Sequence, residues 1–367
     1  MSASFINTSA ASACSYELDK NDPVLQQERQ ESKGIKVVDH FRYAMFCLLV
    51  FMLHRDLLLN FRRFRVLTTF PKLGKILFRN RWKELEKLRS DRDEVVIRLI
   101  KSRIGSGNSE PQLGSNQIVA YVDTLVNLRF PEEDSDHGNG ERLNLNEMAT
   151  ICSEFLNGGT DTTTTALQWV MANLVKHPHI QSKLYDEIVE VMGPPPLPLK
   201  GVEPEMVINE EDLQKMPYLK AVVLEGLRRH PPAHFVLPHR VMKEVEVQGY
   251  MIPQGATINF MVGAMGLDPK VWDEPMEFKP ERFLVNDGVF DVSGSKGIKM
   301  MPFGAGRRIC PGSDLALLHL KYFVANLIWY FHWSVPDGCH VDLSEKPEFM
   351  VVMKNPLRAR ISSRAEN

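Results

Sequence analysis

Cys310 lies in a glycine- and arginine-rich stretch of the sequence that extends from residue 303 to residue 312. Glycines in such a stretch allow tight turns and let the backbone approach a flat or bulky ligand. Arg307 and Arg308 keep the surroundings of the cysteine positive, which favours the thiolate over the thiol. The apolar segment 313–326 predicts a helix that begins just after the sulfur and directs its positive end and free N–H groups towards it. A thiolate in this setting suits the ligation of a haem iron.

Two simpler interpretations of the Cys310 stretch stay open at this point. A lone cysteine is commonly a small buried hydrophobic residue without chemistry of its own. A loop rich in glycine and arginine can also hold a phosphate, although the nucleotide-binding pattern ends in Gly-Lys-Ser or Gly-Lys-Thr and this loop does not. Other motifs in the chain must therefore decide between them.

A second unusual stretch, 158–165, combines two glycines, one aspartate and five threonines inside a long helical pattern. Such residues are poor helix formers, so we predict a local opening of the helix that frees a carbonyl and admits a hydroxyl and a water. Gly158 and Gly159 would let a flat ligand approach the backbone. Asp161 beside Thr162 offers an acid and a hydroxyl for proton delivery. The alternative, evenly matched for this stretch alone, is a plain core helix whose threonines bond their own backbone.

Glu225 and Arg228 form a third constellation, adjacent on one face of a predicted helix. Such a pair is common on protein surfaces, where it contributes little to stability. Here the flanking residues are apolar, so we expect the pair to be buried and to need further partners. Arg282, in the sequence Pro-Glu-Arg-Phe, can supply one, which indicates a structural network without a chemical role.

Together these motifs resemble those of cytochromes P450, in the same order along the chain. The pattern Phe-x-x-Gly-x-Arg-x-Cys-x-Gly resembles the haem-ligand loop of that family, and Gly-Gly-x-Asp-Thr resembles its oxygen-activating helix. The trio of Glu225, Arg228 and Arg282 is similar to its structural network. The resemblance extends from about Ile35 to the C-terminus. Segments 37–49, 249–260 and 266–272 look like plant microsomal members, closest to family 89 and its neighbour family 77.

The resemblance implies a role for each matching residue. Cys310 would be the axial ligand of the iron in haem b, while Arg308 and His239 would bond the haem propionates. Asp161 and Thr162 would relay protons. Further cofactor-binding positions are Phe303, Gly304 and Gly312, and the positions expected at the substrate pocket are Gly158, Ala233, His234, Phe235, Val236, Met350 and Val351.

The implied activity is that of a haem-thiolate monooxygenase, which inserts one oxygen atom of O2 into an apolar small molecule. Electrons would come from NADPH through a separate P450 reductase, since no G-x-G-x-x-G follows a predicted strand here. The family implies the cytosolic face of the endoplasmic reticulum membrane. The alternative is a non-catalytic, truncated P450-like haem-binding protein. A third, a reductase-independent haem-thiolate isomerase, is disfavoured by the Gly-Gly-x-Asp-Thr motif.

Composition is consistent with this interpretation and excludes several others. The 367 residues carry a formal net charge of −2, so no overall field favours nucleic acid. The five cysteines are scattered, which argues against a disulfide framework or a zinc site. The best apolar run, 43–53, is too short to span a bilayer. The basic stretch around Trp82 could touch an anionic membrane, but a solvated helix face is favoured because acidic residues from Glu84 onwards interrupt it.

The fold predicted from these patterns is mainly α with minor β-sheets, a P450 fold that lacks its N-terminal anchor, first sheet and early helices. Residues 1–34 are expected to be poorly ordered, and 35–367 to form an incomplete P450 domain. Helices are predicted at 35–103, 117–130, 145–177, 178–191 and 211–229. Strands are predicted at 236–241, 245–252 and 257–261, with a closing hairpin of 349–353 and 358–361.

Overall fold

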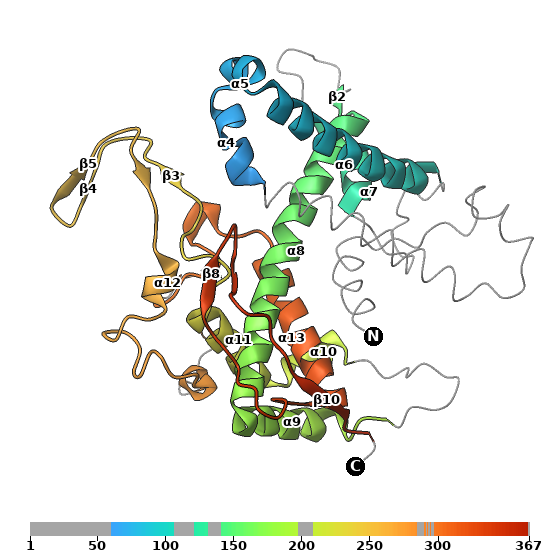
Figure 1. The fold of residues 1–367 in the computed structure, drawn as a ribbon, viewed down its shortest axis with the longest axis vertical. Coiled ribbons are helices and arrows are strands. Elements are labelled where there is room, and N and C mark those ends of the chain that lie inside the picture. Colours follow the sequence, from blue (N-terminus) through green and yellow to red (C-terminus); the bar gives the residue numbers. More distant parts are fainter. Residues whose placement is uncertain are drawn as a thin grey trace, which may run out of the picture. The chain divides into compact units, whose positions relative to one another are not determined.

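The structure, a computed structural model, describes residues 60–105, 121–130, 141–196, 208–284, 290, 292, 294 and 297–365. The predictions for segment 1–34, for the helical residues 35–59 and for the apolar run 43–53 lie outside the described residues. The chain divides into two compact units, Met1–Asp161 and Thr162–Asn367. Both are built mainly from helices, with short two-stranded sheets, as Figure 1 shows. The prediction of a mainly α fold with minor sheets is therefore confirmed.

In the first unit, the single helical stretch predicted up to residue 103 is three helices, α4 (Phe61–Thr69), α5 (Pro71–Leu77) and α6 (Arg79–Gly105). The break at Phe70 follows from Pro71, which starts a new helix because it cannot donate to the previous one. The predicted helix 117–130 is shorter, with α7 at Tyr121–Val126, and is followed by the hairpin of β1 (Arg129–Phe130) and β2 (Glu141–Arg142). The core residues of this unit are Phe64, Leu67, Leu85, Val96, Ile100, Val122, Leu125, Met148, Ala149 and Cys152.

The helix α8 (Leu145–Lys176) begins directly after Asn144. Asn144 Oδ1 accepts the backbone N–H groups of Asn146 and Glu147, both at 3.0 Å. Glu147 Oε2 in turn accepts the N–H of Asn144 at 2.8 Å, which completes a capping box. The helix continues without interruption through residues 158–165, so the predicted local opening is wrong. The Thr160 hydroxyl donates to the Leu156 carbonyl at 2.6 Å, the backbone bonding by which a threonine fits inside a helix.

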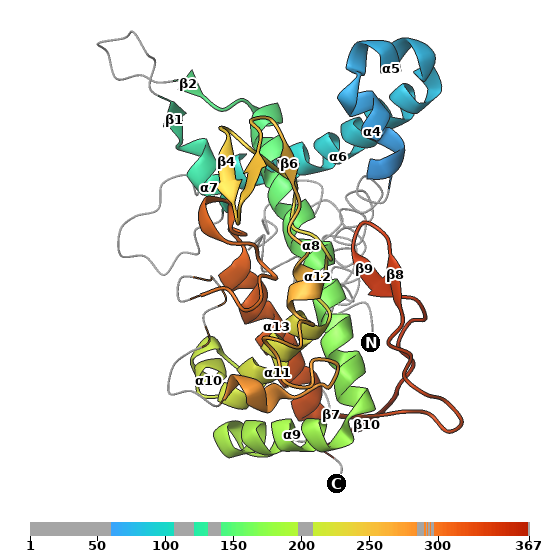
Figure 2. The ribbon, with the colours of Figure 1, turned by 90° about the vertical axis from the view of Figure 1, so that its left-hand side faces the viewer.

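In the second unit, α13 (Ser313–Tyr330) packs against α9 (Pro178–Met192), α10 (Glu210–Gln214) and α11 (Pro217–Arg229). Both ribbon views show α11 and α13 beside the last part of α8 (Figures 1 and 2). The prediction of one helix over 211–229 is wrong, because Pro217 interrupts the backbone pattern and starts α11. Gly226 lets α11 approach α8 closely, since a Cβ at that position would lie 2.4 Å from Val170 Cγ2. The buried core includes Val170, Leu174, Leu184, Leu219, Val222, Ile328 and Trp329.

The sheets of the second unit are antiparallel pairs. β3 (His239–Arg240) pairs with β6 (Thr257–Ile258), and β4 (Val245–Val247) pairs with β5 (Tyr250–Ile252). β8 (Glu345–Pro347) pairs with β9 (Val351–Met353), and β7 (Phe331–Ser334) pairs with β10 (Arg360–Ser363). A short helix, α12 (Val262–Met265), follows β6. The strands predicted from residue 236 to residue 261 exist but are shorter than predicted.

The predicted C-terminal hairpin is wrong. Its two halves, β9 and β10, pair with β8 and β7 and not with each other. β7 follows α13 directly, and its apolar residues read as an extension of that helix in the sequence. A run of strand-forming residues shows that a strand forms but not which strand it joins. Among the described residues, no helix is both long enough and apolar enough to cross a bilayer.

Candidate functional site

The loop that carries Cys310 is closed by backbone hydrogen bonds. The N–H of Cys310 donates to the carbonyl of Phe303 at 2.8 Å, and the N–H of Gly304 donates to Met301 at 3.1 Å. Between them, residues 306–308 form one 3-10 turn. Gly304 adopts φ +72°, in the left-handed region where a side chain would be strained. The loop thus presents Cys310, whose side chain is exposed, on a backbone of fixed shape.

Phe303 anchors this loop to three helices. Its ring packs against a buried cluster of Ala166 from α8, Val223 and Leu227 from α11, and Leu320 from α13. Because these helices also form the main core of the second unit, the position of the sulfur is tied to that core. The cofactor-binding role of Phe303 stays a prediction.

The helix predicted to begin just after the sulfur is present, because α13 starts at Ser313. Gly312 is its N-cap and offers no side-chain acceptor, and the N–H of Ser313, the first helical residue, donates to the carbonyl of Cys310 at 3.4 Å. A Cβ at Gly312 would lie 3.9 Å from Cys310 Sγ, which shows how closely this helix end approaches the sulfur. The N-terminal end of α13, which carries the partial positive charge of the helix dipole, therefore lies beside the sulfur.

This arrangement fits haem. An exposed sulfur beside a helix N-terminus supplies one soft anionic ligand, which suits an iron whose other ligands come from a porphyrin. No group of three or more His, Cys, Asp or Glu side chains that could hold a bare metal ion occurs among the residues described here. Arg308 ends the 3-10 turn two positions before Cys310 and is exposed, so its guanidinium is available to a carboxylate.

His239, the second predicted propionate partner, lies in β3 and has protein partners of its own. Its Nδ1 lies 2.7 Å from the carbonyl oxygen of Leu237, which makes Nδ1 the protonated nitrogen. The ring also meets Phe260 edge-on, with the ring centroids 5.8 Å apart. These contacts leave Nε2 as the nitrogen that could take part in cofactor binding.

Two of the predicted pocket segments meet in the second unit. The N–H of Val351 donates to the carbonyl of Pro232 at 2.8 Å, which joins β9 to the segment 233–236. A Cβ on Gly304 would lie 3.9 Å from Val236 Cγ1, so the same segment also reaches the cysteine loop. Met350 immediately precedes Val351, and Ala233, His234 and Phe235 lie between Pro232 and Val236.

The remaining predicted residues lie on α8. Gly158 and Asp161 belong to the first unit, and Thr162 is the first residue of the second. Gly158 is exposed, and a Cβ there would meet no atom within 4 Å, so the helix surface is open at this point. Asp161 and Thr162 are adjacent and partly buried.

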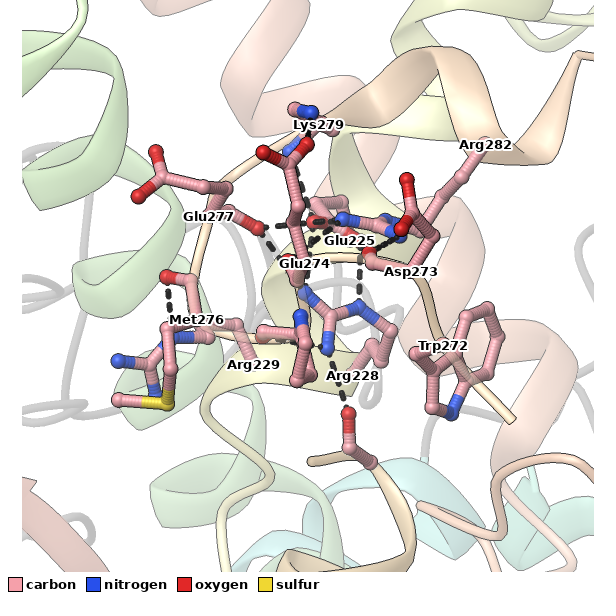
Figure 3. A network of polar contacts seen from close by, with 12 residues as sticks. Glu225, Arg228, Arg229, Trp272, Asp273, Glu274, Met276, Glu277, Lys279 and Arg282 are labelled. Atoms are coloured by element: carbon pink, nitrogen blue, oxygen red, sulfur yellow. Dashed lines mark hydrogen bonds and ion pairs between the residues drawn. The ribbon is translucent and has the colours of Figure 1, made fainter. Parts of the chain in front are cut away.

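The trio predicted to form a structural network is assembled, as Figure 3 shows. Arg228 donates to Glu225 through two bonds, Nε–Oε2 at 2.7 Å and Nη2–Oε1 at 2.8 Å, and both side chains are 0% exposed. Arg282 Nε donates to Glu225 Oε1 at 3.2 Å. The other Arg228 protons go to the carbonyls of Gly266 (2.5 Å), Pro275 (2.9 Å) and Glu277 (3.2 Å).

Sequence reasoning missed Glu345 and His230. Glu345 lies between two histidines, 3.3 Å from His230 Nδ1 and 2.8 Å from His234 Nε2. Glu345 is separated from both histidines by more than 100 residues, so no local spacing relates them. His230 precedes Pro231 and Pro232, and this pattern predicted only that the helix ends there.

Comparison with known proteins gives three informative likenesses. Residues 29–361 match the family model described as cytochrome P450. The chain is 45% identical over 358 residues to cytochrome P450 89A9 of Arabidopsis thaliana, which covers 92% of this chain and 67% of that protein. It is 35% identical over 289 residues to cytochrome P450 98A1 of Sorghum bicolor, and the match covers 77% of this chain and 51% of that protein. A solved structure of retinoic acid bound cyanobacterial CYP120A1 superposes with a TM-score of 0.60 at 25% identity, and the match covers 77% of this chain and 57% of that chain.

The buried pair yields a testable prediction. Glu225→Gln keeps the side-chain shape but removes the negative charge that pairs with the Arg228 guanidinium. Breaking a buried ion pair by removing one partner costs about 3–5 kcal/mol. We expect a loss of that order in the free energy of unfolding, measured by urea denaturation. The matched control is Asp337→Asn, which breaks the exposed Asp337–Arg360 ion pair and should leave stability unchanged. Equal stability of the two variants would contradict the burial argument.

Proposed function

Because the chain belongs to the cytochrome P450 family, we propose that it is a haem-thiolate monooxygenase that inserts one oxygen atom of O2 into an apolar small molecule. The observation that carries the proposal is the exposed thiol of Cys310 beside the N-terminus of α13, on a loop closed by the hydrogen bond from the Cys310 backbone N–H to the Phe303 carbonyl. The cofactor of the family is haem b, whose iron binds and activates O2 when a thiolate ligates it. The chain spans between about half and two thirds of the length of these relatives.

Cofactor binding is proposed to use residues of the second unit. The Cys310 thiolate binds the iron, and the N–H groups at the start of α13 stabilise its charge. Arg308 and His239 bond the two propionates. Gly312 leaves the space beside the sulfur free of a side chain, and Gly304 does the same beside Val236.

Asp161 and Thr162 are proposed to deliver protons. They are neighbours on one continuous helix, so their relative geometry is fixed by the backbone of α8. The carboxyl group can exchange a proton with solvent, and the hydroxyl can accept it and pass it on to a water it holds. This chemistry needs no opening of the helix.

Electrons are proposed to come from NADPH through a P450 reductase. The substrate is proposed to be apolar, because Phe235, Val236, Met350 and Val351 supply hydrophobic surface in the segments that meet at the cysteine loop. The alternative function is a non-catalytic haem-binding protein, which would keep the cysteine loop without turning over a substrate.

The location is proposed to be the cytosolic face of the endoplasmic reticulum membrane, with α5 in contact with lipid. Around α5 the exposed apolar side chains are Phe70, Leu73, Ile76, Leu77 and Phe78. Ile76 is 77% exposed and Leu77 63%. Residues 61–83 contain eight Lys or Arg residues and no Asp or Glu. Exposed apolar residues in a stretch this rich in Lys and Arg suit an anionic bilayer surface better than bulk water.

The cysteine assignment is tested by the spectrum of the reduced carbon monoxide complex. The chain loaded with haem should give the red-shifted Soret band typical of thiolate ligation. Cys310→Ala should abolish this band, whereas Cys339→Ala, at another exposed cysteine, should leave it intact. A band that persists in Cys310→Ala would refute the ligand. A normal band without reductase-driven turnover of any apolar substrate would favour the alternative function.

The proton-delivery role is tested by Thr162→Ala. Positioned proton transfer contributes about 100- to 10,000-fold to a rate, so we expect the product formed per NADPH to fall by at least about tenfold while hydrogen peroxide rises. The measurement is the ratio of product and peroxide to NADPH consumed, with reductase present. Thr164→Ala, at an exposed position on the same helix, is the control. Unchanged coupling in Thr162→Ala would remove this residue from the mechanism.

Membrane contact is tested by co-sedimentation with phosphatidylcholine vesicles, with and without phosphatidylserine. Replacing Ile76 and Leu77 by serine should weaken binding by more than about tenfold, because burying each such side chain contributes about 1.5–3 kcal/mol. The control Val271→Ser removes an exposed apolar residue from the second unit and should bind normally. Binding of the double variant within about twofold of the unmodified chain, or no dependence on phosphatidylserine, would disprove the contact.

A further inference from the structure

The Glu345 carboxylate joins two histidines that follow the end of α11. Its Oε1 lies 3.3 Å from His230 Nδ1, and its Oε2 lies 2.8 Å from His234 Nε2. The side chain of His230 is 1% exposed, whereas those of His234 and Glu345 are 35% and 29% exposed. One acidic group at the start of β8 therefore holds both ends of the short segment 230–234.

His230 is also fixed from its other side. Its ring stacks on the indole of Trp169 from α8, with ring centroids 4.1 Å apart and an angle of 5° between the planes. The indole Nε1 of Trp169 donates to the carbonyl of Val351 at 2.8 Å, and the N–H of Val351 donates to Pro232. These contacts join α8, β9 and the segment after α11 to one another. Glu345 adds an ionised side chain that contacts His230 from β8.

His234 is held in the same way against α12. Its carbonyl accepts the N–H of Gly263 at 3.2 Å, and its ring lies so close that a Cβ on Gly263 would be 3.0 Å from Cδ2. Two residues later the N–H of Val236 donates to the carbonyl of Phe260 at 3.2 Å. The ring of His234 thus has one fixed orientation, with Nε2 on Glu345.

The charges around His230 define its protonation. Burial lowers the pKa of His230, and the neighbouring Arg229 and Arg228 act in the same direction, while the hydrogen bond to Glu345 opposes them. The pKa of Glu345 is lowered, chiefly by its hydrogen bond from His230. A carboxylate only accepts, so Nδ1 of the neutral His230 carries the proton and donates it to Glu345. Nε2 is then a buried acceptor without a partner among the described residues.

We propose that Glu345 is a positioning residue for the substrate-binding segment 233–236, which it fixes against the β8–β9 hairpin through His230 and His234. This proposal rests on the proposed function, because that function makes segment 233–236 part of the substrate pocket. The carboxylate does not touch the reacting atoms. It determines where the side chains of the segment point, and so which apolar molecules fit.

Acid should loosen this arrangement, and the sign follows from the pKa shifts. Both His230 and Glu345 have a lower pKa in the folded chain than in the unfolded chain. Their contribution to stability is therefore complete above the ordinary histidine pKa of about 6.5 and is lost as the pH falls. The groups that act on His230 are Glu345 from β8 and Arg228 and Arg229 from α11.

The contact itself is tested by NMR titration of the histidine-labelled full chain, which does not require activity. His230→Gln identifies the His230 signal. In Glu345→Gln the midpoint of the His230 titration should move down by about one pH unit or more, because an opposite charge has been removed. Glu348→Gln, on the same hairpin and paired with Lys346, is the control and should not move it. An unchanged midpoint in Glu345→Gln would overturn the proposal.

The positioning role is tested on the haem-loaded chain with two probes. Clotrimazole is bulky enough to reach the pocket walls, whereas imidazole reaches only the iron. Glu345→Gln should weaken clotrimazole binding, followed by its spectral shift, by about tenfold and leave imidazole binding within about twofold. His234→Asn should produce the same selective loss of clotrimazole binding. Because this ring is partly exposed, the second variant tests the proposal even if Glu345→Gln fails to fold.

The outcomes separate the two ideas. Equal weakening of both probes would show that Glu345 supports the whole fold, and unchanged clotrimazole binding would show that it positions nothing; either result overturns the proposal. If the unmodified chain binds neither probe, the haem site and the proposed function fail. The substrate-positioning role then falls with them, although the NMR titration still shows whether the contact exists.

Discussion

The ion pair between Glu225 and Arg228 is the interaction that imposes the most order on the second unit. Taking two charges out of water costs several kcal/mol per ion, so the pair is tolerable only if every remaining donor finds an acceptor. Arg228 finds its acceptors in the carbonyls of Gly266, Pro275 and Glu277. These three carbonyls belong to segment 266–277, which has little regular structure. The hydrogen bonds to the Arg228 guanidinium therefore fix the backbone conformation of that segment. Gly266 is required there, since a Cβ would lie 2.2 Å from the carbonyl oxygen of Arg228.

That segment in turn supports the cysteine loop. The indole of Trp272 lies over the Arg228 guanidinium, with 5.4 Å between Cζ and the ring centroid. Trp272 also packs with Leu224 from α11 and with Met300. The next residue, Met301, accepts the N–H of Gly304 and so begins the turn that presents Cys310. A buried charge on α11 is thereby connected, through the ring of Trp272 and the two methionines Met300 and Met301, to the loop that carries the sulfur.

The sequence predicted those features that depend on neighbouring residues. The start of α13 and the Glu225–Arg228 pair are each set within a few positions of the chain. Features that depend on distant segments were not predictable in this way. Ile361 pairs with Trp333, and no residue pattern in either strand identifies the other. The threonine-rich run was misjudged for a related reason. Helix propensity takes no account of tertiary packing, which overrides it here, because Thr163 and Thr165 are buried.

Two residues at the C-terminal end of α11, Arg228 and His230, belong to two different networks of contacts. Arg228 turns to the carbonyls of segment 266–277 and, through Trp272, supports the cysteine loop. His230, two residues later, turns to Trp169 and Glu345 and fixes the segment that leads to Val236. Val236 returns to the cysteine loop at Gly304. Because both networks start from one helix end, the Cys310 loop and the proposed substrate segment are both positioned by α11.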